Sequence, residues 1–320
     1  MDLKQEVLVT GPFYGPSLEW LGREFTTHDL YTAKNQQAML AEVGPRVRAI
    51  AGTGRADAAL IDSLPKLEII ANFGVGYDNV DAVAARARRV MVTNTPGVLN
   101  QAVADTTLSL ILAIERRVVA ADRYLRAGKW VANGNYPLTR HLGDLKLGIL
   151  GLGRIGKEIA KRATTFDMQV QYHSRTRQPD VTYPYFPSVL ALAKASDVLV
   201  CILPGGASTR HMVNEEVMKA LGPTGTLVNV ARGSVVDTEA LVRCLKDGSL
   251  GAAAIDVYDK EPETPEALWP LENVVLTPHL GSGTHATRKK MGDLVVQNLI
   301  EHFAGRPVLT AVPECADLKR

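Results

Sequence analysis

The stretch KLGILGLGRIG at residues 146–156 decides the fold of this chain. Its first part, 146–150, is an apolar run that is typical of a buried strand. A helical pattern follows from Gly156 to Thr165, and a second strand-like run follows from Gln169 to His173. A strand, a glycine-rich turn, a helix and another strand within about 30 residues indicate the βαβ unit of a dinucleotide-binding domain.

The glycines and amides of this turn have separate roles. Gly151 permits the tight turn, Gly153 lets a pyrophosphate approach the backbone, and Gly156 allows the helix to pack closely on the strand. The amides of Arg154 and Ile155 would then face the phosphates at the positive end of the helix. The turn therefore predicts a cofactor site that uses all five residues.

Strand-like and helix-like runs alternate on both sides of this unit. The expected strands are 7–9, 47–51, 67–71, 90–93, 145–150, 169–173, 198–203, 227–230, 252–255 and 274–276. The expected helices between and after them are 17–25, 33–43, 56–64, 80–88, 156–165, 189–195, 215–221, 238–246 and 287–303. One long helix over 100–125 and a polar loop over 128–144 separate two such blocks. The alternation predicts an α/β protein with two doubly wound parallel-sheet lobes.

Bulk properties narrow the class of protein. A length of 320 residues favours two domains, and a formal net charge of +2 without basic blocks argues against nucleic acid and membrane surfaces. The three cysteines are widely spaced, so we expect free thiols and neither a disulfide framework nor a metal site. The start lacks a signal-peptide pattern and no apolar run is long enough to span a membrane, so the cytoplasm is the expected location.

The end of the second strand indicates which dinucleotide is preferred. NAD sites usually carry an acid there that binds the ribose 2′-hydroxyl. This chain has Ser174, Arg175 and Thr176 instead, and no acid occurs between Asp167 and Asp180. Hydroxyls and arginines suit a 2′-phosphate, so the segment predicts NADP(H) in preference to NAD(H). The alternative is that the arginines are solvated loop charges.

Three further residues follow apolar strands at the edge where open α/β sheets bind ligands. Arg232 can clamp a carboxylate and polarise a neighbouring carbonyl. His279 can donate a proton to that carbonyl, and Glu261 beside it would favour the charged imidazole. Each residue alone is more often structural, and His285 is a rival acid. Together they predict hydride transfer to or from a carbonyl next to a carboxylate.

The segment NFGVGYDNVD at residues 72–81 contributes a different kind of site. Its glycines leave backbone amides free at the end of an expected strand, and such a nest binds anions. We expect the amides of Val75 and Gly76 to hold the substrate carboxylate from one side, with Arg232 on the other. A simple turn in which Asp81 caps the next helix is the alternative, and the two interpretations are compatible.

Over nearly its whole length the chain resembles the D-isomer-specific 2-hydroxyacid dehydrogenases. The segments that carry the resemblance are 72–81, 94–96, 102–105, 148–156, 229–233, 256–262 and 277–281. Within the family, 72–77 and 203–209 are most similar to NADPH-dependent glyoxylate/hydroxypyruvate reductases and related hydroxyphenylpyruvate reductases.

The resemblance implies roles for individual residues. Arg232 binds and polarises the substrate, Glu261 supports the histidine, and His279 is the acid/base. Val75 and Gly76 hold the carboxylate through their amides. Asp256 contacts the nicotinamide carboxamide, and the remaining cofactor contacts fall on Leu203, Pro204, Thr209, Val230, Ala231 and Gly281.

The resemblance also implies a domain plan. A Rossmann nucleotide domain, 99–282, is inserted into a flavodoxin-like substrate domain made of 1–98 and 283–320. Such proteins are usually homodimers that pair through the nucleotide domain. An aromatic residue from the partner borders the active site, and both Trp130 and Tyr136 are candidates here.

The expected function is therefore NADPH-dependent reduction of glyoxylate or hydroxypyruvate to the D-2-hydroxy acid. One alternative is the same reaction on a bulkier 2-oxo acid, such as 2-ketogluconate or hydroxyphenylpyruvate. The other alternative is a protein of another class, a dinucleotide-sensing binding protein without enzymatic activity. Turnover of glyoxylate with NADPH would separate the enzyme from the sensor.

Overall fold

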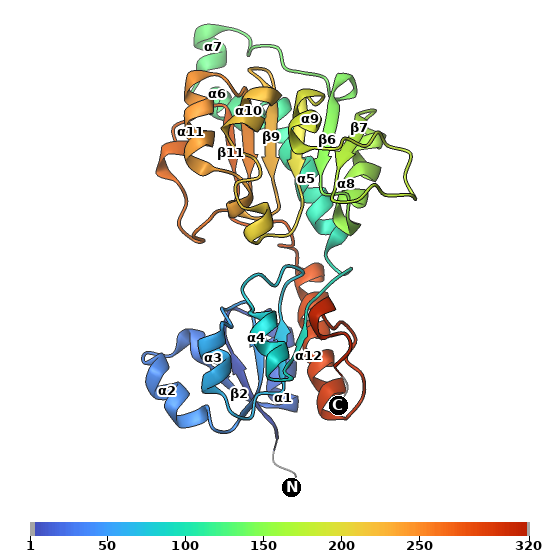
Figure 1. Ribbon diagram of the computed structural model, residues 1–320. Coiled ribbons are helices and arrows are strands. Elements are labelled where there is room, and N and C mark those ends of the chain that lie inside the picture. Colours follow the sequence, from blue (N-terminus) through green and yellow to red (C-terminus); the bar gives the residue numbers. More distant parts are fainter. Residues whose placement is uncertain (1–3, 319–320) are drawn as a thin grey trace. The chain divides into compact units, whose positions relative to one another are not determined.

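A computed structural model describes residues 4–318 of the chain and shows two compact units (Figure 1). Unit 1 comprises the described residues up to Leu99 together with those from Thr284 onward, and unit 2 comprises Asn100–Gly283. The sequence of unit 2 thus interrupts that of unit 1. Each unit is built on its own parallel sheet, which confirms the predicted fold class of two parallel-sheet α/β lobes.

Unit 1 contains a five-stranded sheet with the order β2-β1-β3-β4-β5. This is the strand order of flavodoxin-like folds. The strands are β1 (Glu6–Val9), β2 (Thr26–Asp29), β3 (Val47–Gly52), β4 (Ile69–Asn72) and β5 (Met91–Thr93). The helices are α1 (Gly15–Glu24), α2 (Gln36–Val43), α3 (Ala58–Ser63), α4 (Ala82–Ala87) and α12 (His285–Phe303). Strand β2 was not expected, because its sequence TTHD is polar and lies only half-buried at the sheet edge.

Unit 2 contains a six-stranded parallel sheet with the order β11-β10-β9-β8-β6-β7. The strands are β6 (Lys146–Leu150), β7 (Gln169–His173), β8 (Val198–Cys201), β9 (Thr226–Asn229), β10 (Ala252–Ile255) and β11 (Val274–Leu276). The chain passes from β6 to β7 on one side and then to β8 on the other side of β6. The order therefore reverses at β6, and the carboxyl ends of the strands at such a switch point are where open sheets bind ligands.

Helices cover both faces of this sheet (Figure 1). Strand side chains alternate between the faces. Leu147 and Ile149 pack with α5 (Asn100–Glu115) and α8 (Arg154–Thr165). Leu150 packs on the other side with α9 (Val189–Lys194), α10 (Glu215–Leu221) and α11 (Thr238–Asp247). Short 3₁₀ turns complete both units: η1 (Leu30–Thr32), η2 (Leu142–Asp144), η3 (Ala207–Thr209), η4 (Gly233–Val235), η5 (Glu266–Leu268) and η6 (Pro313–Cys315).

The prediction of one helix over 100–125 is wrong. Helix α5 ends at Glu115, and Arg117 adopts a left-handed backbone conformation with φ +49°. A separate helix α6 (Val118–Arg126) then begins, and a short helix α7 (Lys129–Asn133) lies within the predicted loop. The apolar pattern continues through the break, because α6 also carries apolar residues, although none of them is fully buried and Val118 and Leu125 are exposed.

Candidate active site

The glycine turn, residues 151–156, connects β6 to α8 and tolerates no side chain at two of its positions. Gly151 has φ +106°, and a Cβ there would lie 2.4 Å from the carbonyl oxygen of Ile202. A Cβ at Gly156 would lie 2.3 Å from the carbonyl oxygen of Gly151. At Gly153, by contrast, no atom of the described residues comes within 4 Å of such a Cβ. The turn is therefore tightly packed on one side and open at the glycine that would face a pyrophosphate.

Helix α8 begins at Arg154 with Gly153 as its N-cap and without a side-chain cap from any described residue. Its counterparts α10 and α11 begin differently, because Asn214 and Asp237 each accept a hydrogen bond from a first-turn amide. The first amides of α8, including those of Arg154 and Ile155, are thus left to water or an anion. This geometry fits a dinucleotide pyrophosphate.

The loop after β7 carries the residues expected to select the cofactor. Ser174 is half-buried and donates a 2.7 Å hydrogen bond to the carbonyl oxygen of Thr176, while Arg175 and Thr176 are exposed. Within residues 4–318, Arg175 pairs with no acid. The nearest acid downstream, Asp180, instead forms an ion pair with Lys157. The loop therefore presents a positive charge.

The end of β8 lies beside the glycine turn. A Cβ at Gly151 would be 3.2 Å from the Cβ of Leu203, so Leu203 borders the turn directly. The segment then closes on itself, because the Thr209 hydroxyl donates a 2.8 Å hydrogen bond to the carbonyl oxygen of Pro204. The parallel pairing of β6 with β8 thus brings these predicted cofactor residues together.

Arg232 follows β9 in a turn that Asn229 organises. The buried Asn229 side chain accepts a hydrogen bond from the Ala231 amide (3.1 Å) and donates one to the Arg232 carbonyl oxygen (2.9 Å). The half-buried guanidinium of Arg232 donates from Nη1 to the carbonyl oxygen of Ala231 at 2.8 Å. Val230 and Ala231 themselves are buried at the strand end.

His279 and Glu261 form a hydrogen-bonded ion pair. The distance from His279 Nδ1 to Glu261 Oε2 is 2.7 Å, and 44% of the His279 side chain is exposed. Burial alone would raise the pKa of Glu261, but the hydrogen bonds from His279 and the Tyr258 amide and the charges of His279 and Arg232 lower it. The carboxylate therefore stays charged and fixes Nδ1 as the proton-bearing nitrogen that faces it, so that Nε2 can exchange a proton with a substrate.

Asp256 holds the histidine loop, residues 277–281, in place. Its Oδ1 accepts hydrogen bonds from the Thr277 hydroxyl (2.6 Å) and the Leu280 amide (2.7 Å), and its Oδ2 accepts one from the Gly281 amide (2.9 Å). His279 adopts φ +51°, a conformation that L-residues rarely take. The buried carboxylate of Asp256 thus has a structural role in the loop besides the nicotinamide contact that the resemblance implied.

Tyr258 links Glu261 to the histidine loop. Its hydroxyl donates to the carbonyl oxygens of Ile255 (3.2 Å) and Thr277 (3.0 Å), and its amide donates to Glu261 Oε1 (3.0 Å). Burial and the nearby charges of Asp256 and Glu261 raise the pKa of Tyr258 to about 12, so the hydroxyl keeps its proton.

In unit 1, the amide turn (residues 74–76) follows β4. Asn72 donates to the carbonyl oxygens of Gly74 (3.1 Å) and Gly76 (2.9 Å), and Asn94 donates to that of Val75 (2.8 Å). Within residues 4–318, the amides of Val75 and Gly76 donate no hydrogen bond. The two asparagines thus hold the carbonyls of the turn and leave its amides available to an anion.

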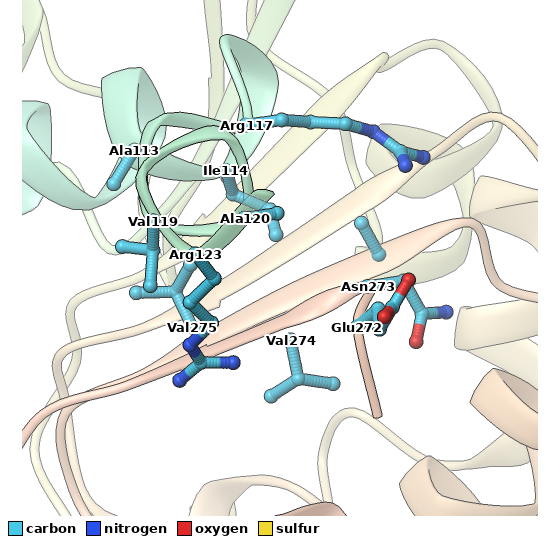
Figure 2. Close-up of a pocket in the computed structure, with 11 residues that line it drawn as sticks. Ala113, Ile114, Arg117, Val119, Ala120, Arg123, Glu272, Asn273, Val274 and Val275 are labelled. Carbon is cyan, nitrogen blue, oxygen red and sulfur yellow. The ribbon is translucent and has the colours of Figure 1, made fainter. Parts of the chain in front are cut away.

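Other parts of the chain are less suited to chemistry. His285 is the first residue of α12 in unit 1, exposed beside the ring of Tyr14. A shallow hollow is lined by the end of α5, by α6 and by the first residues of β10 and β11 (Figure 2). It therefore lies at the amino ends of the strands, the edge opposite His279.

In the described part of the chain, no three His, Cys, Asp or Glu side chains gather as metal ligands, and no helix is long and apolar enough to cross a membrane.

Sequence reasoning did not assign roles to several residues that support the site. Asn72 and Asn94 shape the amide turn and Asn229 shapes the turn of Arg232, while Thr277 and Tyr258 stabilise the histidine loop. All of these except Tyr258, which follows β10 by three residues, share a signal: a polar side chain directly at the end of a strand, where an unpaired polar group would be unfavourable.

A family model described as "D-isomer specific 2-hydroxyacid dehydrogenase, NAD binding domain" matches residues 108–281. Hydroxyphenylpyruvate reductase from Plectranthus scutellarioides is 48% identical over 91% of this chain and 94% of its own length. Glyoxylate/hydroxypyruvate reductase A HPR2 from Arabidopsis thaliana is 47% identical over the same shares.

Solved structures show the same likeness. An NADPH-dependent glyoxylate/hydroxypyruvate reductase from Sinorhizobium meliloti, in complex with NADP and malonate, aligns with a TM-score of 0.91 at 41% identity and covers 99% of both chains. A 2-hydroxyacid dehydrogenase from Ketogulonicigenium vulgare Y25 aligns with a TM-score of 0.90 at 45% identity, over 97% of this chain and 98% of that one.

Proposed function

Because this chain belongs to the D-isomer-specific 2-hydroxyacid dehydrogenase family, we propose that it reduces glyoxylate or hydroxypyruvate to the D-2-hydroxy acid with NADPH. One observation carries the proposal: the 2.7 Å pair of His279 and Glu261 follows the strands of the same sheet that bears the open glycine turn. A proton donor and a dinucleotide site at one sheet edge are what hydride transfer to a carbonyl requires.

Each site residue has a separate role in the proposed reaction. The bound dinucleotide supplies the hydride. Arg232 binds the carboxylate of the 2-oxo acid and polarises its keto oxygen. His279 donates its proton to that oxygen, and Glu261 stabilises the imidazolium that is needed before each turnover. In unit 1, the amides of Val75 and Gly76 bind carboxylate oxygen.

Cofactor contacts are proposed for the glycine turn, its first helical amides and the neighbouring strand ends. The open position at Gly153 and the uncapped start of α8 support this assignment. The full set is Gly151, Gly153, Arg154, Ile155, Gly156, Leu203, Pro204, Thr209, Val230, Ala231, Asp256 and Gly281, together with Ser174, Arg175 and Thr176 at the 2′-phosphate.

The preference for NADPH is tested by Arg175→Ala. This change should raise KM for NADPH by about tenfold, the effect of one charge-assisted hydrogen bond, and leave KM for NADH nearly unchanged. Arg243→Ala removes the same charge from an exposed position on α11 and serves as the control. Equal weakening of both cofactors, or a wild-type enzyme that uses both equally well, would show that the loop does not read the phosphate.

A bulkier 2-oxo acid is the second candidate substrate, because a hydroxyphenylpyruvate reductase is among the similar relatives. A panel of glyoxylate, hydroxypyruvate, 2-ketogluconate and hydroxyphenylpyruvate, assayed with NADPH, distinguishes the two candidates. Turnover of none of these acids would contradict the proposed function and favour the dinucleotide-sensing alternative.

We also propose that the protein is a homodimer that pairs through unit 2. Large apolar side chains are exposed along α6, α7 and the segment after them: Val118 (55%), Leu125 (54%), Trp130 (58%), Val131 (97%) and Leu138 (101%). A patch of this kind on a folded unit indicates a protein interface. Tyr136 packs on Tyr124 in its own chain, whereas Trp130 is exposed, so Trp130 is the better candidate to reach a partner. The molar mass in solution tests the pairing.

A further inference from the structure

Arg288 lies in the first turn of α12, beside the amide turn of unit 1. Its guanidinium carbon is 5.7 Å from the centre of the Phe73 ring. Phe73 is 4% exposed, directly precedes Gly74 in the chain and packs against the Phe13 ring at 5.0 Å. The cation is thus held over an apolar platform, and the Phe73 of that platform directly precedes the turn that carries the amides of Val75 and Gly76.

No carboxylate of the described residues compensates this cation. Within residues 4–318, Arg288 pairs with no carboxylate, and no carbonyl oxygen accepts a hydrogen bond from its side chain. Burial lowers the pKa of Arg288, and no acidic group opposes that effect. A positive charge in the first turn of a helix is also disfavoured by the helix dipole. The fold therefore keeps a half-buried, unpaired guanidinium where several local interactions disfavour it.

The neighbouring cations of the same turn are ordinary surface groups. Lys289 forms an ion pair with Asp293 at 2.5 Å, and Lys290 is exposed. Only Arg288 of these three is turned onto the aromatic platform. This difference indicates that its position serves an interaction other than solubility of the helix.

We propose that Arg288 is a substrate-binding residue whose guanidinium binds the carboxylate held by the amides of Val75 and Gly76. The amides are neutral donors, and their turn is shaped so that the carbonyl oxygens point to Asn72 and Asn94. Arg288 supplies the net positive charge that the turn lacks, and its planar fork suits two carboxylate oxygens. This inference rests on the proposed reduction of a 2-oxo acid and assigns to unit 1 a charged carboxylate site of its own.

The test compares Arg288→Met with Lys290→Met. Methionine keeps an unbranched chain that can pack on Phe73 but removes the charge. KM for glyoxylate and hydroxypyruvate should rise together by about tenfold or more in Arg288→Met, while KM for NADPH stays unchanged. Lys290→Met loses the same charge from the same turn and should leave every KM within about twofold. Arg288→Lys should lie between wild type and Arg288→Met, because the charge returns without the fork.

Malonate binding separates failure of this inference from failure of the proposed function. If wild type turns over 2-oxo acids and Arg288→Met keeps the wild-type KM, the role of Arg288 is overturned while the reductase function stands. If wild type turns over none of them, malonate remains as the carboxylate probe. A malonate-induced rise in Tm in wild type but not in Arg288→Met supports the site, whereas equal rises or none in wild type overturn it. Arg288→Gln provides the same readouts should Arg288→Met not fold.

Discussion

The six-stranded sheet of unit 2 carries a carboxylate beside a cation at the carboxyl ends of its strands and another at their amino ends. Burial opposes the charge of both carboxylates, but the net pKa shifts of the two are opposite. At the carboxyl edge, burial would raise the pKa of Glu261, but hydrogen bonds and neighbouring charges together bring it below its usual value. At the amino edge, burial raises the pKa of Glu115, and the hydrogen bond from Thr226 and the charge of Arg140 offset it only in part. The Glu261 side chain is 35% exposed and that of Glu115 is 2% exposed.

The difference lies in how many partners each group has. Both oxygens of Glu261 accept hydrogen bonds, from His279 and from the Tyr258 amide. Glu115 Oε1 has no hydrogen-bond partner among the described residues, and the Arg140 Nη1 that faces its Oε2 is 3.4 Å away. A charge is stable in a partly buried place when its lone pairs are satisfied, and it is disfavoured when they are not. The carboxyl edge is organised to hold a charge next to an exchangeable proton, whereas the amino edge anchors the loop that carries Arg140.

The largest effect should come from removing the proton donor of the carboxyl edge. His279→Ala should lower kcat by about 10²–10⁴-fold, the usual contribution of a positioned acid, while NADPH still binds. Single-turnover rates and cofactor fluorescence titrations measure the two properties separately. His285→Ala is the matched histidine control and should keep kcat within a few-fold. The reverse pattern, with His285 essential and His279 dispensable, would remove the catalytic assignment from this edge.

The second effect is the pH dependence that Glu261 contributes. Glu261→Gln keeps the shape of the side chain but removes the charge that favours the protonated imidazole. Reductase activity should fall less than in His279→Ala, and it should fade at a lower pH than in wild type. Activity measured from pH 5 to pH 9 gives both quantities, and an unchanged pH profile would contradict the pairing.

The pH dependence of the stability of the folded chain tests the pair of Glu261 and His279 in a second way. The pKa of Glu261 is lowered on folding, so its contribution to stability is present above the usual carboxyl pKa of 4.5 and is lost as the pH falls through the folded-state value. Glu261→Gln should therefore lose stability at neutral pH relative to acidic pH.

The sequence was sufficient to predict most of this architecture, because short continuous apolar runs and helical patterns alternate clearly around the glycine turn. Strands β7, β10 and β11 begin and end as predicted. The polar edge strand β2 and the break at Arg117 were missed, since an edge strand needs no apolar pattern and the apolar stripe of α6 continues through the break. The predictions of secondary structure thus fail at elements whose side chains are not buried in the core of their own unit.

The same limit applies to the site. The proximity of Arg232, Glu261 and His279 could be predicted because each follows an apolar run, and strand ends meet at one edge of a parallel sheet, whereas their roles stay predictions. The tasks of Asn229 and Asp256 could not, because they depend on which backbone groups the turns leave unpaired. Arg288 was missed for another reason: its lack of an acidic partner becomes visible only when the surroundings of α12 are known.

The smallest expected effect concerns Glu115 at the amino edge. Its contribution to stability changes with pH in the opposite direction to that of Glu261. The pKa of Glu115 is raised on folding, so its favourable contribution is present below the usual value of 4.5 and is lost as the pH rises through the folded-state value. Glu115→Gln makes the group neutral at every pH and keeps an oxygen that can accept from Thr226. The variant should therefore gain stability relative to wild type as the pH is raised from 4 to 8, by an amount on the order of 1 kcal/mol.

Urea unfolding at several pH values measures this difference, with Glu216→Gln as the control because Glu216 is exposed on the same unit. The control should show no pH-dependent difference from wild type. Reductase kcat should stay unchanged in Glu115→Gln, because Glu115 lies at the edge opposite His279. A variant that is less stable than wild type at pH 8 by more than at pH 4 would mean that Arg140 makes the charge of Glu115 favourable in spite of burial and of the negative charge of Asp197. The amino edge would then hold its carboxylate in the same way as the catalytic edge, and the contrast between the two edges would have to come from exposure alone.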